Sequence, residues 1–540
     1  MPKKFKTAMI VAVACLLLLT MGSVFLTSAT PKSVTSSLSS PSSPSSQCGW
    51  DTASGWVLRE NLHAGTPSWA VGIPLEYSGD YTVVEPKAPL VITPAPNPNA
   101  KAVEGWFDQS SARCGDVVGL HVTGNGRPVT VKVFRMGYYK GAGARLIQTI
   151  VTKPVPTNSK FHVTPAPQST VTTSWPTTWS FKVTKATPPG QYLFRLDDGG
   201  SDSSLVPLTI TNPQSKSDIT MVSSVLTWQS YNQWGGYSLY RGPNRNRLTR
   251  ANVVSFNRPY DGSGDGQFRY MEYPILKLAE QLGLNLNYVT DLELNQNASS
   301  LANTSSIVLG GHAEYWTTVM RASLQSAVDR GVNLVSFGGN AVYNRPRYDS
   351  KTREMIMWRG SKSDPSNLDP LLATSVWRSP PILQPESVLL GSQYVGLGVD
   401  GNYRIQNPNR WPFNTERHPN MLNSIVGLEV DSPLYSPGPA VESLARADII
   451  FSGKKVTTMA TYYTNSKGAG VMDIGTNGWT CAIDNICPWH PNISKDTQID
   501  SRLVTIQILK GLTKGPLGKW RPAIPDVPAR TKTILISSLP

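Results

Sequence analysis

The amino-acid sequence predicts a protein of mixed β and α/β class, in which a β-sandwich precedes an α/β domain. Between residues 103 and 213, short alternating hydrophobic and polar stretches are separated by Gly, Pro and Asn, which is typical of antiparallel sandwiches. After Pro213, candidate strands alternate with candidate helices, a pattern that indicates parallel strand pairing. We therefore expect a sandwich domain at residues 103–213 and an α/β domain with a mostly parallel sheet at residues 218–518.

The elements of the α/β domain are predicted from hydrophobic periodicity and from the residues that end each run. Buried parallel strands appear as short apolar runs, whereas helices show apolar residues three and four positions apart. The expected strands are 219–226, 306–309, 332–337, 457–461 and 470–474, and the expected helices are 275–282, 316–328 and 504–512. The residues from 350 to 437 are rich in Pro, Asn and Arg, so we expect an irregular insertion there, placed to cover the domain as a lid. Residues 519–540 are expected to form a tail.

The N-terminal region is predicted to direct the chain out of the cytoplasm. Lysines within the first six residues precede an apolar run from Thr7 to Leu26, which is the pattern of an export signal. Residues 1–29 are therefore a signal peptide or an N-terminal anchor, and the length of the apolar run leaves both open. A Ser/Pro/Thr-rich stalk at residues 30–47 and an N-terminal extension at residues 48–102 follow. We expect a secreted or extracytoplasmic protein, tethered by this segment if it is not cleaved.

Cysteine usage agrees with export. Apart from Cys15 in the apolar run, the chain has four cysteines, and an even number in an exported protein favours disulfides over free thiols. Cys481 and Cys487 are the expected local pair, so that Cys48 and Cys114 would tie the extension to the sandwich. No Cys-x-x-Cys pair or histidine at ligand spacing supports a zinc site.

The charge of the chain does not indicate nucleic-acid binding. The formal net charge is +14, with a pI near 9.4, but the basic residues are spread along the sequence. The most basic stretch, Arg241 to Arg250, is expected to be a solvated loop. We expect no nucleic-acid partner and contact with a membrane only through the N-terminal segment, and a homo-oligomer remains open.

Polar side chains follow three of the predicted strands at the points where the strands end. His312 and Glu314 come after the strand 306–309, Asn340 follows the next strand, and Tyr231 follows the first. Because parallel strands end at the same edge of a sheet, and ligands of α/β proteins bind there, these side chains are expected to face one crevice.

Several ordered motifs also resemble a known family. They are Phe134-Arg135-Met136-Gly137-Tyr138-Tyr139 and Gly141-Ala142-Gly143-Ala144-Arg145 in the sandwich, Tyr231-Asn232-x-Trp234-Gly235-Gly236-x-Ser238-Leu239-Tyr240, Ser255-Phe256-x-Arg258-Pro259-Tyr260, Gly311-His312-x-Glu314-Tyr315-Trp316 and Gly339-Asn340-x-x-Tyr343. From Val103 to about Leu512, the chain resembles the N,N-dimethylformamidase large (beta) subunit and its relatives. The resemblance implies an N-terminal immunoglobulin-like β-sandwich and an amidotransferase-like (flavodoxin-like) α/β domain.

The same resemblance implies a mononuclear Fe(3+) centre held by two tyrosines and one glutamate. The residues matched to this centre are the metal ligands Tyr231, Tyr240 and Glu314, with Tyr237 as the alternative second tyrosine, and the catalytic residues His312 and Asn340. Phenolate and carboxylate oxygens suit a hard cation, and three protein ligands leave positions open for water or substrate. The metal would act on an amide carbonyl and on water, while His312 moves a proton and Asn340 orients the substrate or the developing oxyanion.

Two functions are therefore compared. The first is an exported, metal-dependent hydrolase-like protein that cleaves a C–N amide bond, with a small-molecule amide or an unknown compound as substrate. The alternative is a non-catalytic cell-surface or glycan-binding protein that retains the fold and uses Trp228, Trp234 and Trp316 for recognition. No Gly-x-Ser-x-Gly or His-Glu-x-x-His motif occurs, which excludes the usual serine-hydrolase and zinc-protease arrangements.

Overall fold

The computed structural model describes residues 48–71 and 102–534, except residues 159, 201, 361–362, 367–368, 370, 486, 488 and 491–492. The predicted signal or anchor and the stalk lie outside the described residues, as does most of the second half of the predicted extension. Within these described ranges, no helix combines the length and the apolar character needed to cross a membrane.

The N-terminal part contains two β-sheets that share one hydrophobic core. The core takes alternate residues from both sheets, including Val118 and Leu120 from one sheet and Val131 and Phe194 from the other. One sheet has the order β1 (Glu104–Phe107), β3 (Val117–Thr123), β8 (Thr177–Lys182), and the other has the order β2 (Ser111–Ala112), β10 (Ser203–Ile210), β9 (Gly190–Asp197), β4 (Pro128–Met136), β5 (Ala144–Pro154).

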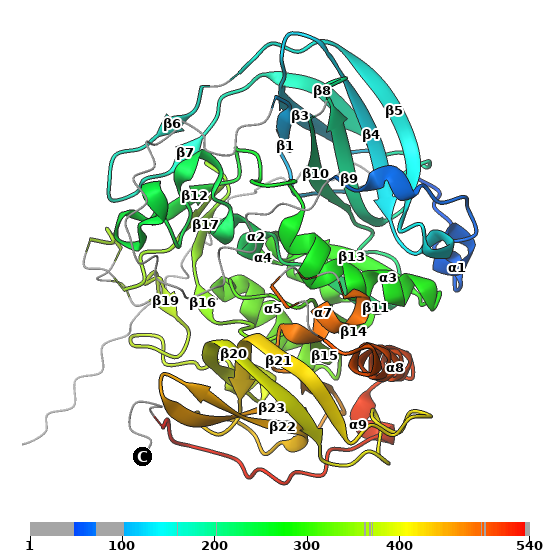
Figure 1. The fold of residues 1–540 in the computed structure, drawn as a ribbon, viewed down its shortest axis with the longest axis vertical. Coiled ribbons are helices and arrows are strands. Elements are labelled where there is room, and N and C mark those ends of the chain that lie inside the picture. The colour runs from blue at the N-terminus through cyan, green and yellow to red at the C-terminus, as the bar shows by residue number, and fades with distance from the viewer. Residues whose placement is uncertain are drawn as a thin grey trace, which may run out of the picture. The chain divides into compact units, whose positions relative to one another are not determined.

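A nine-stranded sheet forms the centre of the α/β part (Figure 1). Its first five strands pair in parallel, and the remaining pairings are antiparallel. The strand order is β13 (Leu286–Thr290), β11 (Ser217–Ser223), β14 (Thr304–Leu309), β15 (Asn333–Ser336), β24 (Gly470–Asp473), β23 (Lys454–Thr464), β22 (Glu442–Phe451), β20 (Gln393–Ile405), β21 (Met421–Ser432). The expectation of a mostly parallel sheet therefore holds for only one half of it.

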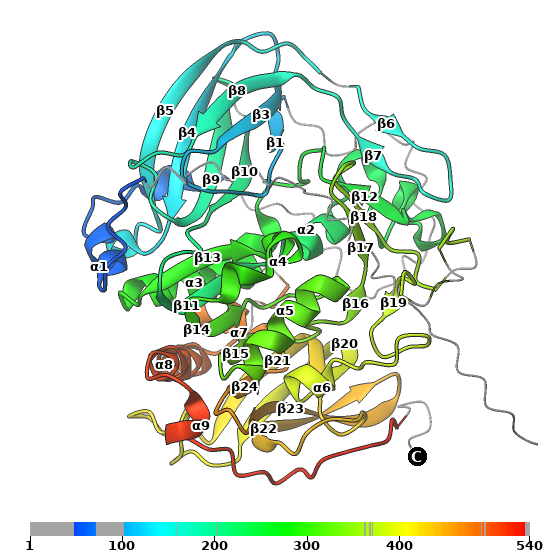
Figure 2. The same ribbon diagram turned by 180° about the vertical axis from the view of Figure 1, so that it is seen from behind.

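Helices pack on this sheet in two groups, as Figures 1 and 2 show from opposite sides. Their apolar stripes provide the contacts; in α3, for example, Ile275, Leu278 and Ala279 are buried. The first group is α3 (Tyr273–Gln281), α7 (Gly478–Asp484) and α8 (Lys495–Leu512), and the second is α2 (Val225–Tyr231), α4 (Asp291–Gln296) and α5 (Thr318–Asp329). The short helices are α1 (Trp56–Glu60), α6 (Ser387–Leu390) and α9 (Leu517–Trp520). A small three-stranded sheet has the order β12 (Val253–Ser255), β18 (Glu354–Ile356), β17 (Arg347–Asp349). Two further pairs of strands are β16 (Asn344–Arg345) with β19 (Ser375–Val376), and β6 (His162–Val163) with β7 (Val171–Thr172).

Two segments have more regular structure than we expected. The segment 350–437 was expected to be irregular, but it contains the long strands β20 and β21, which extend the central sheet. Residues 519–534 do not project as a free tail, because Val527 and Arg530 form β-bridges with Val441 and Gly438. Both segments have few apolar residues in simple alternation, so their pairing depends on neighbours that a local pattern does not reveal.

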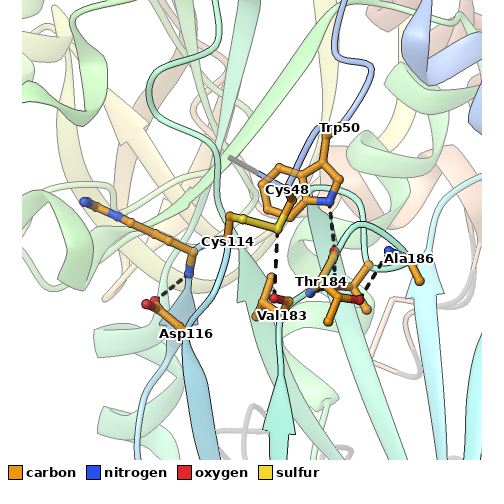
Figure 3. Close-up of a disulfide and its surroundings, with 9 residues drawn as sticks. Cys48, Trp50, Cys114, Asp116, Val183, Thr184 and Ala186 are labelled. Carbon is orange, nitrogen blue, oxygen red and sulfur yellow. Dashed lines mark hydrogen bonds between the residues drawn. A yellow bond between two sulfur atoms is a disulfide. The ribbon is translucent and has the colours of Figure 1, made fainter. Parts of the chain in front are cut away.

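Both predicted disulfides are confirmed. Cys481 and Cys487 close a short loop, and Cys48 joins Cys114 across a separation of 66 residues. Figure 3 shows the second bond beside the turn where Trp50 donates its indole N–H to the carbonyl of Thr184 at 3.0 Å. This disulfide therefore ties the extension to the edge of the sandwich.

A buried ion pair joins the sandwich to the α/β part. The guanidinium of Arg135 on β4 lies 2.8 Å from the carboxylate of Glu280 on α3, and both side chains are fully buried. Asn61, which follows α1, donates to the same carboxylate at 2.6 Å, so the extension takes part in this contact. The hydrophobic core of the α/β part likewise includes Phe134 and Trp56, and the described residues form one compact unit.

We expect Arg135→Met to destabilise the protein strongly, because Glu280 would remain buried without its cation. Removing one partner of a buried ion pair costs about 3–5 kcal/mol in the free energy of unfolding, which urea denaturation would measure. The control is Lys455→Met, which breaks an exposed pair with Asp448 at 2.8 Å and should change the midpoint little. Equal losses in the two variants would contradict the role given to Arg135.

Candidate functional site

The candidate site lies where the parallel strands β11, β14, β15 and β24 end. The Gly-Gly turn after β14 leads to His312 and Glu314, and the Gly-Gly turn after β15 leads to Asn340. These two turns touch, since a Cβ atom on Gly338 would lie 2.0 Å from the carbonyl oxygen of Gly311. Only a residue without a side chain allows this approach, so the two polar loops are held side by side at the edge of the sheet.

The carboxylate of Glu314 is the centre of the site. Tyr231 donates its hydroxyl to Oε2 at 2.8 Å, and Tyr240 donates to Oε1 at 2.6 Å and to Oε2 at 2.7 Å. Asn344 adds an amide donor at 2.6 Å from Oε1. The structure therefore brings together the three residues that were matched to metal ligands, although Tyr231 and Glu314 are 83 residues apart in the chain.

Helix α2 carries Tyr231 to this point directly from the end of β11. The loop after β14 is fixed to the helix by Thr227, whose hydroxyl accepts hydrogen bonds from the backbone N–H groups of Glu314 at 3.0 Å and of Tyr315 at 3.2 Å. Thr227 is completely buried. The phenol of one segment and the carboxylate of the other are thus held at a fixed separation.

Tyr240 reaches Glu314 from the loop after α2. The backbone N–H of Leu239 donates to the carbonyl of Ser230 at 3.0 Å, which folds this loop back along the helix. The rings of Tyr231 and Tyr240 then stack, with centroids 4.3 Å apart and an interplanar angle of 23°. Tyr237, the alternative second tyrosine, instead packs near Trp234 in a separate aromatic cluster.

A second polar group surrounds His312, which is almost completely buried. Its Nε2 atom lies 3.0 Å from Oε2 of Glu429 and 3.6 Å from Oε2 of Glu314. Asn340 and Asn477 each donate a side-chain N–H to Glu429 at 3.1 Å. The Oδ1 atom of Asn340 is buried and has no hydrogen-bond partner among the described residues.

Glu429 and Asn477 were not assigned to the site from the sequence. Glu429 lies on β21, in the segment that was expected to be irregular. Asn477 follows β24, so the rule that placed His312 and Asn340 at a strand end also applies to it. Asn344 was missed because its position depends on pairing between two loops. Its loop pairs with the loop after β14 through a bridge between Asn344 and Tyr315, and no local sequence pattern signals this pairing.

The loop after β15 has a strained backbone. Asn340 and Val342 have φ values of 61° and 56°, in the left-handed region that a β-branched residue such as valine rarely adopts. Hydrogen bonds from the N–H of Val342 to Ala313 at 2.8 Å and from Tyr343 to Glu314 at 3.0 Å hold it there. Strain of this kind is concentrated at functional sites.

Burial and like charge shape the electrostatics of the site. Burial, followed by the nearby charge of Glu429, raises the pKa of Glu314 to about 7. Burial also raises the pKa of the Tyr240 phenol well above its ordinary value, and the charge of Glu314 adds to this effect. Burial disfavours the charged form of His312, but Glu429 and Glu314 outweigh it and raise the pKa of that imidazole. The site therefore concentrates acidic oxygen atoms that are unfavourable to ionise without a cation.

A cavity of about 190 Å³ opens beside these groups. Its lining includes the five site residues Tyr231, Tyr240, Glu314, Asn340 and Glu429, and also Arg241 and Arg247. The segment 350–437 contributes Tyr394 and Leu397, as well as Glu429, to the wall of the cavity.

The three tryptophans considered for glycan recognition are buried. Trp228, Trp234 and Trp316 are 5%, 1% and 0% exposed. Stacking on a sugar needs an accessible ring face, so these residues serve as packing groups in this structure.

Comparison with known proteins identifies the family. A family model described as "N,N-dimethylformamidase beta subunit-like, C-terminal" matches residues 130–493. The match defines a dimethylformamidase-like protein, which suggests a hydrolase. The chain belongs to the N,N-dimethylformamidase beta subunit-like family.

Other comparisons add little. Comparison with curated proteins gives no match. Among solved structures, a cycloisomaltooligosaccharide glucanotransferase of Paenibacillus sp., complexed with cycloisomaltoheptaose, is 8% identical, and the match covers 56% of this chain and 61% of that one. Its TM-score of 0.15 is too low to support any inference about the fold.

Glu272 fixes the start of the helix α2, which carries Tyr231. Its carboxylate accepts hydrogen bonds from the backbone N–H of Ser224 at 2.9 Å and from the indole of Trp228 at 2.8 Å, which fixes the start of α2. Burial raises the pKa of Glu272 from 4.5 to about 8. At neutral pH the folded protein therefore keeps a proton on this group, whereas the unfolded chain releases it.

We expect Glu272→Gln to flatten the pH dependence of stability. In the wild type, stability should fall as pH rises from about 4.5 towards 8, by at most about 1.4 kcal/mol per pH unit, and the loss should end above the folded pKa. Urea denaturation across this range measures the slope, with Glu416→Gln as a control at an exposed carboxylate. An unchanged slope in Glu272→Gln would contradict this assignment.

Proposed function

We propose that the protein is an exported amide hydrolase in which Tyr231, Tyr240 and Glu314 hold a ferric ion. The observation that carries this proposal is the meeting of two phenol oxygens and one carboxylate at a single point, with oxygen–oxygen distances of 2.6 to 2.8 Å. For metal–oxygen bonds of about 2 Å, neighbouring ligand oxygens lie roughly 2.8–3.3 Å apart. Small movements of these side chains would therefore suffice to form a common coordination sphere.

The chemistry of the donor set also fits this ion. Phenolate and carboxylate are hard oxygen donors, and three anionic ligands balance the charge of Fe(3+). A cation bound between these oxygens would take the place of the hydroxyl protons that Tyr231 and Tyr240 now donate to Glu314. It would also reduce the repulsion between the carboxylates of Glu314 and Glu429. When bound, the ferric ion would polarise an amide carbonyl and make a nearby water molecule more acidic.

The remaining residues supply proton transfer and orientation. In amide hydrolysis, the oxygen of water adds to the carbonyl carbon, the C–N bond breaks, and the amine leaves with a proton, so that an amide and water yield a carboxylic acid and an amine. His312, with Glu429 at 3.0 Å, is suited to give the leaving nitrogen its proton. Glu429 then holds the imidazole in place and takes up the proton released by water.

Of the two roles expected for Asn340, orienting the substrate suits the structure better than binding an oxyanion. Its Nδ2 atom already donates to Glu429, and its unpartnered buried atom is the acceptor Oδ1. An acceptor orients water or an amide N–H, whereas an oxyanion needs a donor. We therefore assign to Asn340 the positioning of the nucleophilic water or of the substrate N–H.

Export is part of the proposal. The apolar N-terminal run and the stalk favour it in the sequence, and the two disulfides are compatible with an oxidising compartment. Fractionation of cells that produce the full chain would place it outside the cytoplasm.

Loss of any one proposed ligand should release the iron. We expect Tyr231→Phe, Tyr240→Phe and Glu314→Ala to bind less than about a tenth of the wild-type iron and to lose the visible phenolate-to-iron absorption. Metal analysis and absorption spectroscopy of purified, untagged protein measure both. The matched control is Tyr237→Phe, which should keep the iron and the colour. Retention of the iron and of the visible absorption in Glu314→Ala would contradict the assignment of Glu314 as an iron ligand.

His312 should be needed for turnover but not for iron. We expect His312→Asn to keep its iron and to lower the rate of amide cleavage by about 10²–10⁴-fold, the usual contribution of a general acid. Amine release from simple amides gives the rate, and incorporation of ¹⁸O from labelled water into the acid shows that the reaction is hydrolysis. His418→Asn, the same change at an exposed position, should be fully active. A fully active His312→Asn variant would remove this residue from the mechanism.

A further inference from the structure

A segment rich in arginine borders the candidate site. Residues 241–250, called the basic loop below, follow Tyr240 directly and contain Arg241, Arg245, Arg247 and Arg250. From the sequence this segment was expected to be a solvated loop, and residues 244–249 are indeed exposed. Two of its arginines, however, belong to the wall of the cavity beside Glu314.

The cavity is lined by both acidic and basic side chains. Of the acidic ones, Glu314 accepts hydrogen bonds from both tyrosines, and Glu429 lies beside His312. Of the basic ones, Arg247 has no carboxylate of the described residues within salt-bridge distance. The neutral polar side chains of Gln233 and Ser238 also line the cavity.

A further guanidinium group, that of Arg359, lies next to the basic loop, 5.3 Å from the ring centroid of Tyr240. Burial, followed by the charge of Arg359, lowers the pKa of Arg250. Arg359 itself donates to the hydroxyl of Tyr315 at 3.1 Å, and its second terminal nitrogen is buried without a hydrogen-bond partner among the described residues. These guanidinium groups raise the positive potential around Tyr240 and the basic loop, which favours the binding of anions nearby.

We propose that Arg247, together with Arg241, binds the anionic group of the substrate, so that the amide cleaved at this site carries a carboxylate. The inference rests on the proposed function for the cleavage itself. A cavity of about 190 Å³ fits a small molecule rather than a polymer, and an N-acyl amino acid places a carboxylate a few bonds from its amide. Arginine is suited to this role, because its planar fork matches the two oxygens of a carboxylate.

The test compares a charged and a neutral amide of similar length in the iron-loaded full chain. We expect kcat/KM for N-acetylglycine to exceed that for N-ethylacetamide by at least about tenfold. Arg247→Gln should reduce this ratio by at least about fivefold, mainly through KM, because a partly exposed charge contributes to binding more than to the chemical step. Arg245→Gln, which removes the same charge from the same loop outside the cavity wall, should leave the ratio unchanged.

Two further measurements identify the anionic group that Arg247 binds. The ratio should fall as sodium chloride is raised from about 50 mM to about 500 mM, because salt screens an exposed charge pair. Acetate should inhibit hydrolysis of N-ethylacetamide in the wild type more than in Arg247→Gln. Inhibition by inorganic phosphate far stronger than by acetate would overturn the carboxylate assignment.

Failure of this inference differs from failure of the proposed function. If both amides are hydrolysed equally well and Arg247→Gln changes nothing, the carboxylate subsite is refuted and amide hydrolysis stands. If neither amide is hydrolysed, calorimetric titration of the wild type and of Arg247→Gln with N-acetylglycine decides the matter. Binding that weakens in Arg247→Gln but not in Arg245→Gln supports the subsite, and the absence of binding overturns it.

Discussion

The carboxylate of Glu314 sets the constraint on which the rest of the site depends. Moving an isolated carboxylate out of water is costly, and the cost is tolerable only where donors or a cation surround it. Here Tyr231, Tyr240 and Asn344 provide those donors, and each comes from a different segment of the chain. The three segments must therefore fold correctly before the carboxylate is satisfied, so the site forms only as part of the complete fold.

The central sheet fixes the positions of the loops that carry the site residues. Parallel strands end at one edge, and the turns after β14 and β15 approach so closely that their backbones touch at Gly311 and Gly338. Beyond this contact, the chain adopts the left-handed conformations at Asn340 and Val342 that turn the loop towards Glu314. The strain costs on the order of 1–3 kcal/mol per residue, and the hydrogen bonds between the two loops offset it. The polar side chains of the site are therefore held in place by the fold itself.

The extent to which the site was predictable differs from residue to residue. His312, Glu314 and Asn340 follow apolar runs, and the geometry of parallel strands is enough to bring them to one edge. Tyr240 was preferred over Tyr237 only because it ends a motif of the family, and the physical reason for its position appears only in the structure, where the loop folds back onto α2. Glu429 was beyond prediction, because β21 joins the sheet by antiparallel pairing to β20, and such long-range pairing leaves no local periodic signal. The same reason explains why only half of the sheet is parallel.

The sandwich is part of the site's support rather than a spacer. Trp234, three residues beyond Tyr231, donates its indole N–H to Glu104 on β1 at 3.0 Å, and it packs on Trp106 and Trp175. The next residue is Gly235, where a Cβ atom would lie 2.5 Å from a methyl group of Val171, so the loop is pressed directly against β7 in the N-terminal part. The loop between the two tyrosines is therefore clamped between two parts of the molecule.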